Sequence, residues 1–456
     1  MIAPGDLRAG EAAAESSVAP RGFTAFATVL FGQVVSMLGS GLTGFALGVW
    51  VYQRTGSATR FALVTLCAML PVVALSPVAG ALVDRWDRRK AMLVGDSGSA
   101  LATLALAGLA WSGRLELWHV YPLLAAGSSF AALQWPAFSA ATTLLVPRRH
   151  LARAGGMTQL GVAAAQILAP LLAGALVGAV GLRGVVLLDF ASFLVALLTL
   201  ALVRFPPPPL TAEGRAAHGS LLAEARQGWL YIRRRPGLRA MLLLLAAANF
   251  SLAILQVLVT PLVLGFASVE VLGVVLGVAG CGMLAGSLAM SVWGGPRRRV
   301  HGILGALLGQ GLILLVGGLR PNAALVAAAA FVFLFATPIG EACSQAIWQS
   351  KVAPDLQGRV FAVRRMVAWS TLPLGYLLAG PLADHVFVPL LLPGGPLADS
   401  VGRAIGVGPG RGIALLFLVL GLLVLATVAV AARQPRLLHV ETELPDAVPD
   451  TPPLTP

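Results

Sequence analysis

The sequence predicts an all-α membrane protein with twelve transmembrane helices in two six-helix halves. Of its 456 residues, 57% are hydrophobic and only 11% are charged, whereas soluble globular proteins carry about 25% charged residues. Twelve apolar windows are long enough to cross a bilayer, which takes roughly 20 residues per helix. The windows lack the two-residue alternation of a transmembrane β-barrel. Together these observations exclude a soluble enzyme, a disordered chain and a small disulfide scaffold.

The twelve windows are the stretches between charged residues, taken in chain order. Nine contain no Asp, Glu, Lys or Arg, and three contain one carboxylate each. Their Leu, Ala, Val and Gly content is typical of helices that pack against one another in a bilayer. They cover residues 22–53, 61–83, 91–113, 117–147, 154–182, 184–203, 240–269, 271–296, 300–319, 321–350, 366–383 and 412–432.

Domain boundaries follow from the longest polar interruption, residues 204–239, which opens with four prolines. This segment is predicted to be a cytoplasmic central loop between two six-helix bundles, residues 22–203 and 240–432. Residues 1–21 form a predicted N-tail. Residues 433–456 hold six prolines and are predicted to be a disordered tail. Basic loops recur at similar places in both halves, as expected of the internal repeats common in secondary transporters.

The distribution of positive charge predicts the topology. If the N-terminus is cytoplasmic, 25 of the 32 Lys and Arg residues fall in cytoplasmic segments, in agreement with the positive-inside rule. Both termini are then cytoplasmic. The first 21 residues show no apolar core with a small-residue cleavage site, so no cleaved signal peptide is expected. These features favour a multi-pass protein of a bacterial inner membrane.

Other classes of protein find little support in the sequence. The net charge of +13 comes from short arginine clusters between apolar runs, a pattern of membrane topology rather than of nucleic-acid binding. Cys67, Cys281 and Cys343 lie inside apolar windows and form no CxxC motif. There is no nucleotide-binding GxxxxGK[ST], no HExxH and no catalytic Ser/His/Asp set in the soluble segments. We therefore expect no metal, no cofactor and no enzymatic activity. A membrane enzyme or receptor remains the alternative from another class.

One loop carries a recognisable motif. Residues 80–90 read GALVDRWDRRK, which resembles the loop 2–3 signature of the major facilitator superfamily. Residues 32–36, 55–57, 134–136 and 358–361 extend the resemblance to the branch of drug:proton antiporters that contains macrolide-efflux and siderophore-export proteins. Residues 165–174 resemble, with alanine in place of three glycines, the antiporter signature GxxxGPxxGG.

The resemblance implies a fold, a mode of transport and a gate. It implies alternating access and proton-coupled export of an amphipathic small molecule, such as an antibiotic, a siderophore or a peptide-like product. An importer or uniporter of a nutrient with the same fold is the alternative, and the substrate stays unnamed. It also implies an inner gate that the loop closes against the eleventh helix. The gating residues would be Gly80, Asp84, Arg85, Arg88 and Arg89; the alternative is that their charges only set topology.

The isolated carboxylates Asp96, Asp189 and Glu341 are the strongest candidates for proton coupling or substrate binding. A charge inside a membrane helix is costly and usually functional. Glu341 is the first choice, because no basic residue lies within two helical turns of it. Asp96 has an alternative role as an ion-pair partner of the arginines in residues 85–89, and Asp189 as a partner of Arg183.

Uncharged polar residues recur on single faces of several windows. The resemblance implies that helices one, four, seven and ten line a central cavity, whereas the alternative is hydrogen bonding between packed helices. The predicted cavity-lining residues are Gln33, Ser36, Ser40, Gln134, Asn249, Gln256 and Gln345. The expected partners are a small-molecule substrate, protons and the lipid bilayer, without nucleic acid, and the protein is expected to be a monomer.

Overall fold

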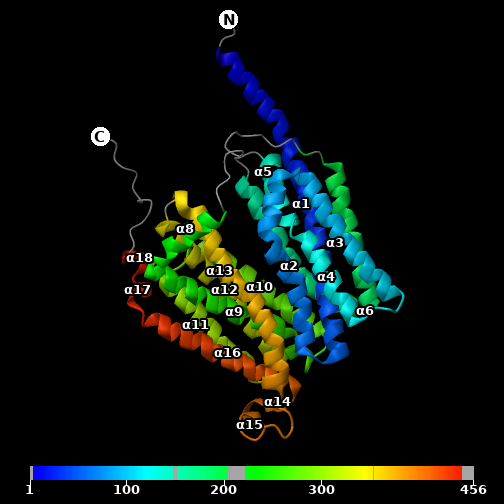
Figure 1. Cartoon of the computed structure of the whole chain (residues 1–456), viewed down its shortest axis with the longest axis vertical. Helices are drawn as coiled ribbons and strands as arrows, with labels where there is room; N and C mark the ends of the chain where they lie inside the picture. The colour runs from blue at the N-terminus through cyan, green and yellow to red at the C-terminus, as the bar shows by residue number, and fades with distance from the viewer. Residues whose placement is uncertain (1–3, 147–150, 204, 206–220, 353, 444–456) are drawn as a thin grey trace. The chain divides into compact units, whose positions relative to one another are not determined.

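The computed structural model describes residues 4–146, 151–203, 205, 221–352 and 354–443, and over these residues the chain is helical without a strand (Figure 1). Ten of the described helices are long and apolar enough to cross a membrane. The prediction of an all-α membrane protein is therefore confirmed. The number of twelve crossings remains a prediction.

The chain forms two compact units. The first contains residues 1–54 and 64–211, and the second contains residues 55–63 and 212–456. The first six helices begin and end as follows: α1 (Pro4–Thr55), α2 (Ala58–Arg85), α3 (Arg88–Trp111), α4 (Leu117–Ala131), α5 (Gln134–Leu145) and α6 (Leu151–Leu202).

Helix α6 contains two of the predicted windows, and its helical backbone is interrupted at Gly181. Gly181 has φ 66° and ψ −179°, a backbone region open essentially only to glycine. The break separates the stretches predicted as windows five and six. The fourth window, in contrast, is divided into α4 and α5. Neither piece alone is long enough to span the bilayer. The division of this window and the merging of windows five and six in α6 together give ten candidate spans for twelve windows.

Small residues bring the helices of the first unit into close contact. A Cβ atom at Gly41 of α1 would lie 2.6 Å from the Ala169 Cβ of α6, and a Cβ at Gly98 of α3 would lie 2.1 Å from the Phe130 ring of α4. Close approach through glycine and alanine is the usual way in which membrane helices gain packing energy. Because α3 also packs against α5 and α6, it is the central helix for the site described below.

The second unit contains the remaining helices. They are α8 (Leu221–Arg233), α9 (Pro236–Leu264), α10 (Val269–Trp293), α11 (Arg299–Gly317), α12 (Ala323–Lys351), α13 (Pro354–Pro381), the π-helix η2 (Leu382–Phe387), α14 (Val388–Leu390), α15 (Val401–Ile405), α16 (Pro409–Ala432), α17 (Pro435–Leu438) and α18 (Val440–Glu443).

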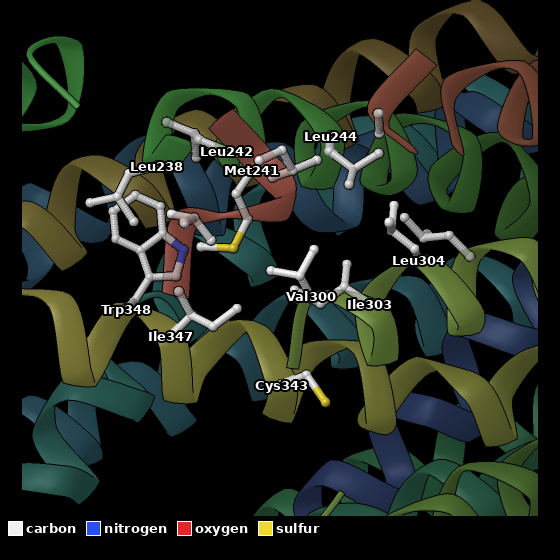
Figure 2. Packing of buried hydrophobic residues seen from close by; sticks show 14 of the residues in the cluster. Leu238, Met241, Leu242, Leu244, Val300, Ile303, Leu304, Cys343, Ile347 and Trp348 are labelled. Atoms are coloured by element: carbon white, nitrogen blue, oxygen red, sulfur yellow. The ribbon is translucent and has the colours of Figure 1, made fainter. Parts of the chain in front are cut away.

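A buried cluster at one end of the second unit joins α9, α11 and α12 (Figure 2). Trp348 of α12 is fully buried next to Leu238 and Met241 of α9, which are also fully buried. Helices in a bilayer associate largely through van der Waals contacts between closely packed side chains of this kind. The cluster therefore fixes the positions of the helices that carry the polar residues of this unit.

The tail is ordered where it was predicted to be disordered. The prediction for 433–456 is wrong for residues 435–443, which form α17 and α18; residues 444–456 lie outside the described part. Leu437 and Val440 are buried, and the Glu441 carboxylate accepts hydrogen bonds of 3.1 Å from the backbone N–H groups of Arg299 and Val300. The prediction failed because it weighed the prolines and not these apolar and capping contacts.

The residues that follow the eleventh window continue α13 as the π-helix η2 and the short helix α14. Asp384 lies in η2, and its carboxylate accepts hydrogen bonds from Ser57 Oγ (2.7 Å), the Ala58 N–H (3.0 Å) and the Thr59 N–H (2.8 Å). These N–H groups open α2, where a helix leaves its first donors without partners. An acid from the far end of the sequence therefore caps α2.

We predict that Gly286→Ala destabilises the second unit. A Cβ at Gly286 of α10 would lie 2.1 Å from the Phe335 carbonyl oxygen of α12, so the helices would have to separate; overpacking of this kind typically costs 1–3 kcal/mol. The purified variant should unfold at a lower temperature than the wild type. Gly305→Ala on α11 is the matched control, because no described atom outside the backbone of its own helix lies within 4 Å of its Cβ position. Equal unfolding temperatures for both variants would contradict the prediction.

Candidate functional site

Asp96 of α3 is fully buried and held by two amides. Its carboxylate accepts hydrogen bonds from Gln33 Nε2 of α1 (2.9 Å) and from Gln134 Nε2 of α5 (2.5 Å). Bonds to an ionised acceptor are stronger than those between neutral groups. This carboxylate therefore joins three helices. The proposed ion pairs with Arg88 and Arg89 are absent, and the Arg85 side chain lies outside the described residues.

Asp189 of α6 is also buried, with an exposed fraction of 2%, and hydroxyl groups surround it. Ser40 Oγ of α1 lies 3.3 Å from Oδ1, and Thr103 Oγ1 of α3 and Ser192 Oγ each lie 3.5 Å from a carboxylate oxygen. Arg183, the ion-pair partner considered for Asp189, is exposed and is not among these contacts. The described partners of Asp189 are thus neutral, as they are for Asp96.

A cavity of about 270 Å³ within the first unit brings these groups together. Its wall combines polar side chains with apolar ones from α2, α3 and α4. We call it the polar cavity, and define it by Gln33, Ser36, Ser40, Gln134 and Asp189. The four predicted cavity-lining residues of the first half therefore share one cavity with one of the predicted carboxylates. Its mostly apolar wall with a few convergent polar groups is typical of small-molecule sites.

A second cavity of about 130 Å³ adjoins the same glutamines. Gln33 and Gln134 line both cavities, and Trp135 and Phe138 add aromatic surface to the smaller one. Trp135 is 53% exposed. The side-chain amides of Gln33 and Gln134 therefore separate the buried Asp96 carboxylate from the two cavities.

Glu341 of α12 has a partner that the sequence did not reveal. Arg364 of α13 attracts it electrostatically, and the same guanidinium donates hydrogen bonds to Gln345 Oε1 (2.6 Å) and Ser344 Oγ (3.2 Å). Its carbon Cζ also lies 5.4 Å from the centre of the Trp348 ring, within the range of a cation–π interaction. The predicted Glu341 and Gln345 thus belong to one cluster around an arginine.

The other two predicted residues of the second half have separate positions. Asn249 of α9 lines a small cavity with Glu341 and donates a hydrogen bond of 3.1 Å to the Ala368 carbonyl of α13. Gln256 accepts a hydrogen bond of 2.9 Å from Tyr376 and lines a cavity whose remaining wall is apolar. Both residues connect α9 to α13, which is the interhelical role considered as the alternative.

The predicted gating loop is described only in part. The side chains of Asp84 and Arg85 lie outside the described residues, so their role stays a prediction. Arg89 donates hydrogen bonds to the carbonyls of Leu200 (2.9 Å) and Ala201 (2.8 Å) at the end of α6, and Arg88 Nε is buried without a described partner. Among the described residues outside the backbone of its own helix, no atom lies within 4 Å of the Cβ position of Gly80, so its place in the gate also stays a prediction.

The protein family is shown by comparison with known proteins. The family model of the Major Facilitator Superfamily matches residues 29–375. The chain belongs to this superfamily. It is therefore a transporter of small molecules in a lipid bilayer and not an enzyme, as the loop of residues 80–90 predicted.

Named relatives of this superfamily include two efflux proteins. The chain is 27% identical over 380 residues to macrolide efflux protein A of Streptococcus pyogenes, covering 80% of this chain and 90% of that protein. It is 28% identical over 392 residues to the multidrug efflux pump Tap of Mycobacterium tuberculosis, with the same coverage. A bacterial homologue of the human lysosomal transporter Spinster, solved in an inward-facing unoccupied conformation, shares the fold with a TM-score of 0.70 and 15% identity, over 93% of this chain and 98% of that one.

We predict that Gln134→Ala destabilises the protein through Asp96. The variant leaves a buried carboxylate with one donor fewer, and a hydrogen bond to a charged group contributes about 1.5–3 kcal/mol. The unfolding temperature in detergent should fall. Gln159→Ala on an exposed position of α6 is the matched control.

A double-mutant comparison separates the hydrogen bond from packing. In an Asp96→Asn background the acceptor is no longer charged, so Gln134→Ala should lower the unfolding temperature less than it does in the wild type. An equal decrease in both backgrounds would show that Gln134 acts through packing alone.

Proposed function

We propose that this chain exports an amphipathic small molecule by proton antiport. The observation that carries the proposal is the polar cavity, whose wall includes a buried carboxylate with neutral described partners. The names of the relatives, a macrolide efflux protein and a multidrug efflux pump, support export as the direction. Members of the superfamily work by alternating access, so one cavity wall can face each side of the membrane in turn.

Asp189 is our first choice for the coupling proton. An ionised carboxylate without a cation is costly inside a bilayer, and taking up a proton removes that cost. In the polar cavity a proton and a cationic group of the substrate would compete for the same carboxylate. Such competition gives antiport when the transporter changes sides only with one of the two ligands bound.

Asp96 and Glu341 rank lower for different reasons. Asp96 lies behind Gln33 and Gln134, so a proton reaches it only if these amides move. Glu341, the first choice from the sequence, is attracted by Arg364. Its protonation would remove this attraction, and a nearby positive charge opposes proton uptake by a carboxylate.

The location follows the charge distribution of the sequence. We propose that the protein lies in a bacterial inner membrane with both termini in the cytoplasm, since most Lys and Arg residues are then on the cytoplasmic side. Drug carried outward from this face would be driven by protons moving inward.

We predict that Asp189→Asn abolishes transport driven by a proton gradient but retains exchange of labelled for unlabelled substrate. The amide keeps the size and hydrogen-bonding groups of the side chain but cannot take up a proton. Both reactions can be measured in vesicles that contain the purified protein. Asp399→Asn, in an exposed segment outside the spans, is the control and should behave as the wild type.

The same assay distinguishes Asp189 from Glu341 as the coupling residue. Full gradient-driven transport by Asp189→Asn would exclude Asp189 as the coupling residue. Loss of coupling in Glu341→Gln instead would restore the choice that the sequence favoured.

We predict that expression lowers the intracellular level of at least one macrolide, siderophore or peptide-like compound in a strain that lacks its own efflux pumps. Collapse of the proton gradient should restore the level of the control strain. Accumulation unchanged across a broad panel, together with faster uptake of a nutrient, would instead show an importer.

A further inference from the structure

A groove between α9, α16 and α17 combines an arginine rim with an apolar floor. It has a volume of about 760 Å³, and all of it belongs to the second unit. Arg239 of α9, Arg433 after α16 and Arg436 of α17 line the rim, while Leu243 and Val430 line the floor. None of the lining residues is acidic.

The three arginines are available to bind a ligand. All three are exposed, and no hydrogen bond or ion pair of their guanidinium groups is found within residues 221–352 and 354–443. Leu243 and Val430 are 60% and 56% exposed. The positive rim therefore lies where α9 begins and α16 ends, and the apolar floor continues along the same helices into their membrane-spanning parts.

The short helix α17 is held firmly enough to form one wall of this groove. Leu437 is buried, and α17 packs on α9 (Figure 1). A Cβ at Gly237 would lie 2.6 Å from the Arg436 carbonyl oxygen, so the two backbones touch. Glu441, a few residues further on, caps α11. Arg433 and Arg436 therefore stand on anchored backbone and not on a loose tail.

We propose that this groove binds an anionic phospholipid, with the phosphate between the arginines and an acyl chain along Leu243 and Val430. Guanidinium groups match phosphate geometry and are common in phosphate recognition. Basic pockets at the ends of spanning helices bind anionic headgroups, and each positive residue near the headgroups adds to the affinity. A free phosphate ion would use the rim alone, and so would not account for the apolar floor.

The test compares two double variants with the same change in charge. Binding of phosphatidylglycerol to the purified full-length protein is titrated in neutral detergent by native mass spectrometry, with phosphatidylcholine as the reference lipid. Arg433→Gln/Arg436→Gln should bind phosphatidylglycerol at least about tenfold more weakly than the wild type, since two headgroup contacts are lost. Arg297→Gln/Arg298→Gln, at exposed positions outside the groove, should bind it as the wild type does.

Two further measurements distinguish a lipid from a free anion. Glycerol 3-phosphate, which has the phosphate without acyl chains, should compete poorly with the lipid. Leu243→Ser should weaken lipid binding, whereas Leu312→Ser at an exposed position of α11 should not. Equal weakening by both double variants, or effective competition by glycerol 3-phosphate, would overturn the proposal. An unchanged unfolding temperature of the groove variants in lipid-free detergent checks that they fold.

Discussion

The structure depends on one constraint: a polar group inside a bilayer must find its hydrogen-bond partners within the protein, because no water is present to supply them. Asp96 shows how the first unit meets it. Amides from α1 and α5 converge on a carboxylate of α3, so the group that is hardest to bury also sets the positions of three helices. Asp189 connects α1, α3 and α6 in the same way through hydroxyl groups. Gln33, Ser40 and Gln134, which line the polar cavity, are thus also the residues that satisfy these two acids.

The two units meet this constraint with different chemistry, and the difference bears on the proposed proton coupling. In the first unit, a proton on Asp189 changes the net charge of the cavity wall while leaving its neutral neighbours in place. In the second unit, the Arg364 guanidinium attracts Glu341 and is held by its hydrogen bonds to Gln345 and Ser344, so a proton on Glu341 would remove an existing attraction. The first arrangement suits a group that must change its charge in each cycle. The second suits a fixed connection between α12 and α13.

Much of this could be predicted from the sequence, and the remainder shows what a sequence does not contain. Hydropathy indicated the spans, and the rarity of charge inside them selected Asp96, Asp189 and Glu341, because both signals are local. The partner of Glu341 could not be predicted, since Arg364 is adjacent only after α12 and α13 pack. Order in α17 and α18 also depends on tertiary contacts of Leu437 and Glu441. The interruption of the helix at Gly181 could not be predicted, because in the sequence this glycine looks the same as glycines that allow helices to pack closely.

The roles of individual arginines also could not be predicted from the sequence. A count of positive charge treats all arginines alike, whereas in the structure their contacts differ. Arg89 binds the final carbonyls of α6, where a cation is favoured by the helix dipole. Arg411, on the predicted outer side, is buried and bonds to the carbonyl of Gly318 at the end of α11. The guanidinium groups of these two arginines therefore have partners within the fold. Arg239, Arg433 and Arg436 have no comparable contact among the described residues, so their charge remains available to the surroundings. At the end of a spanning helix those surroundings are lipid headgroups. An arginine there whose guanidinium has no partner among the described residues is therefore a candidate for lipid binding as well as for setting topology.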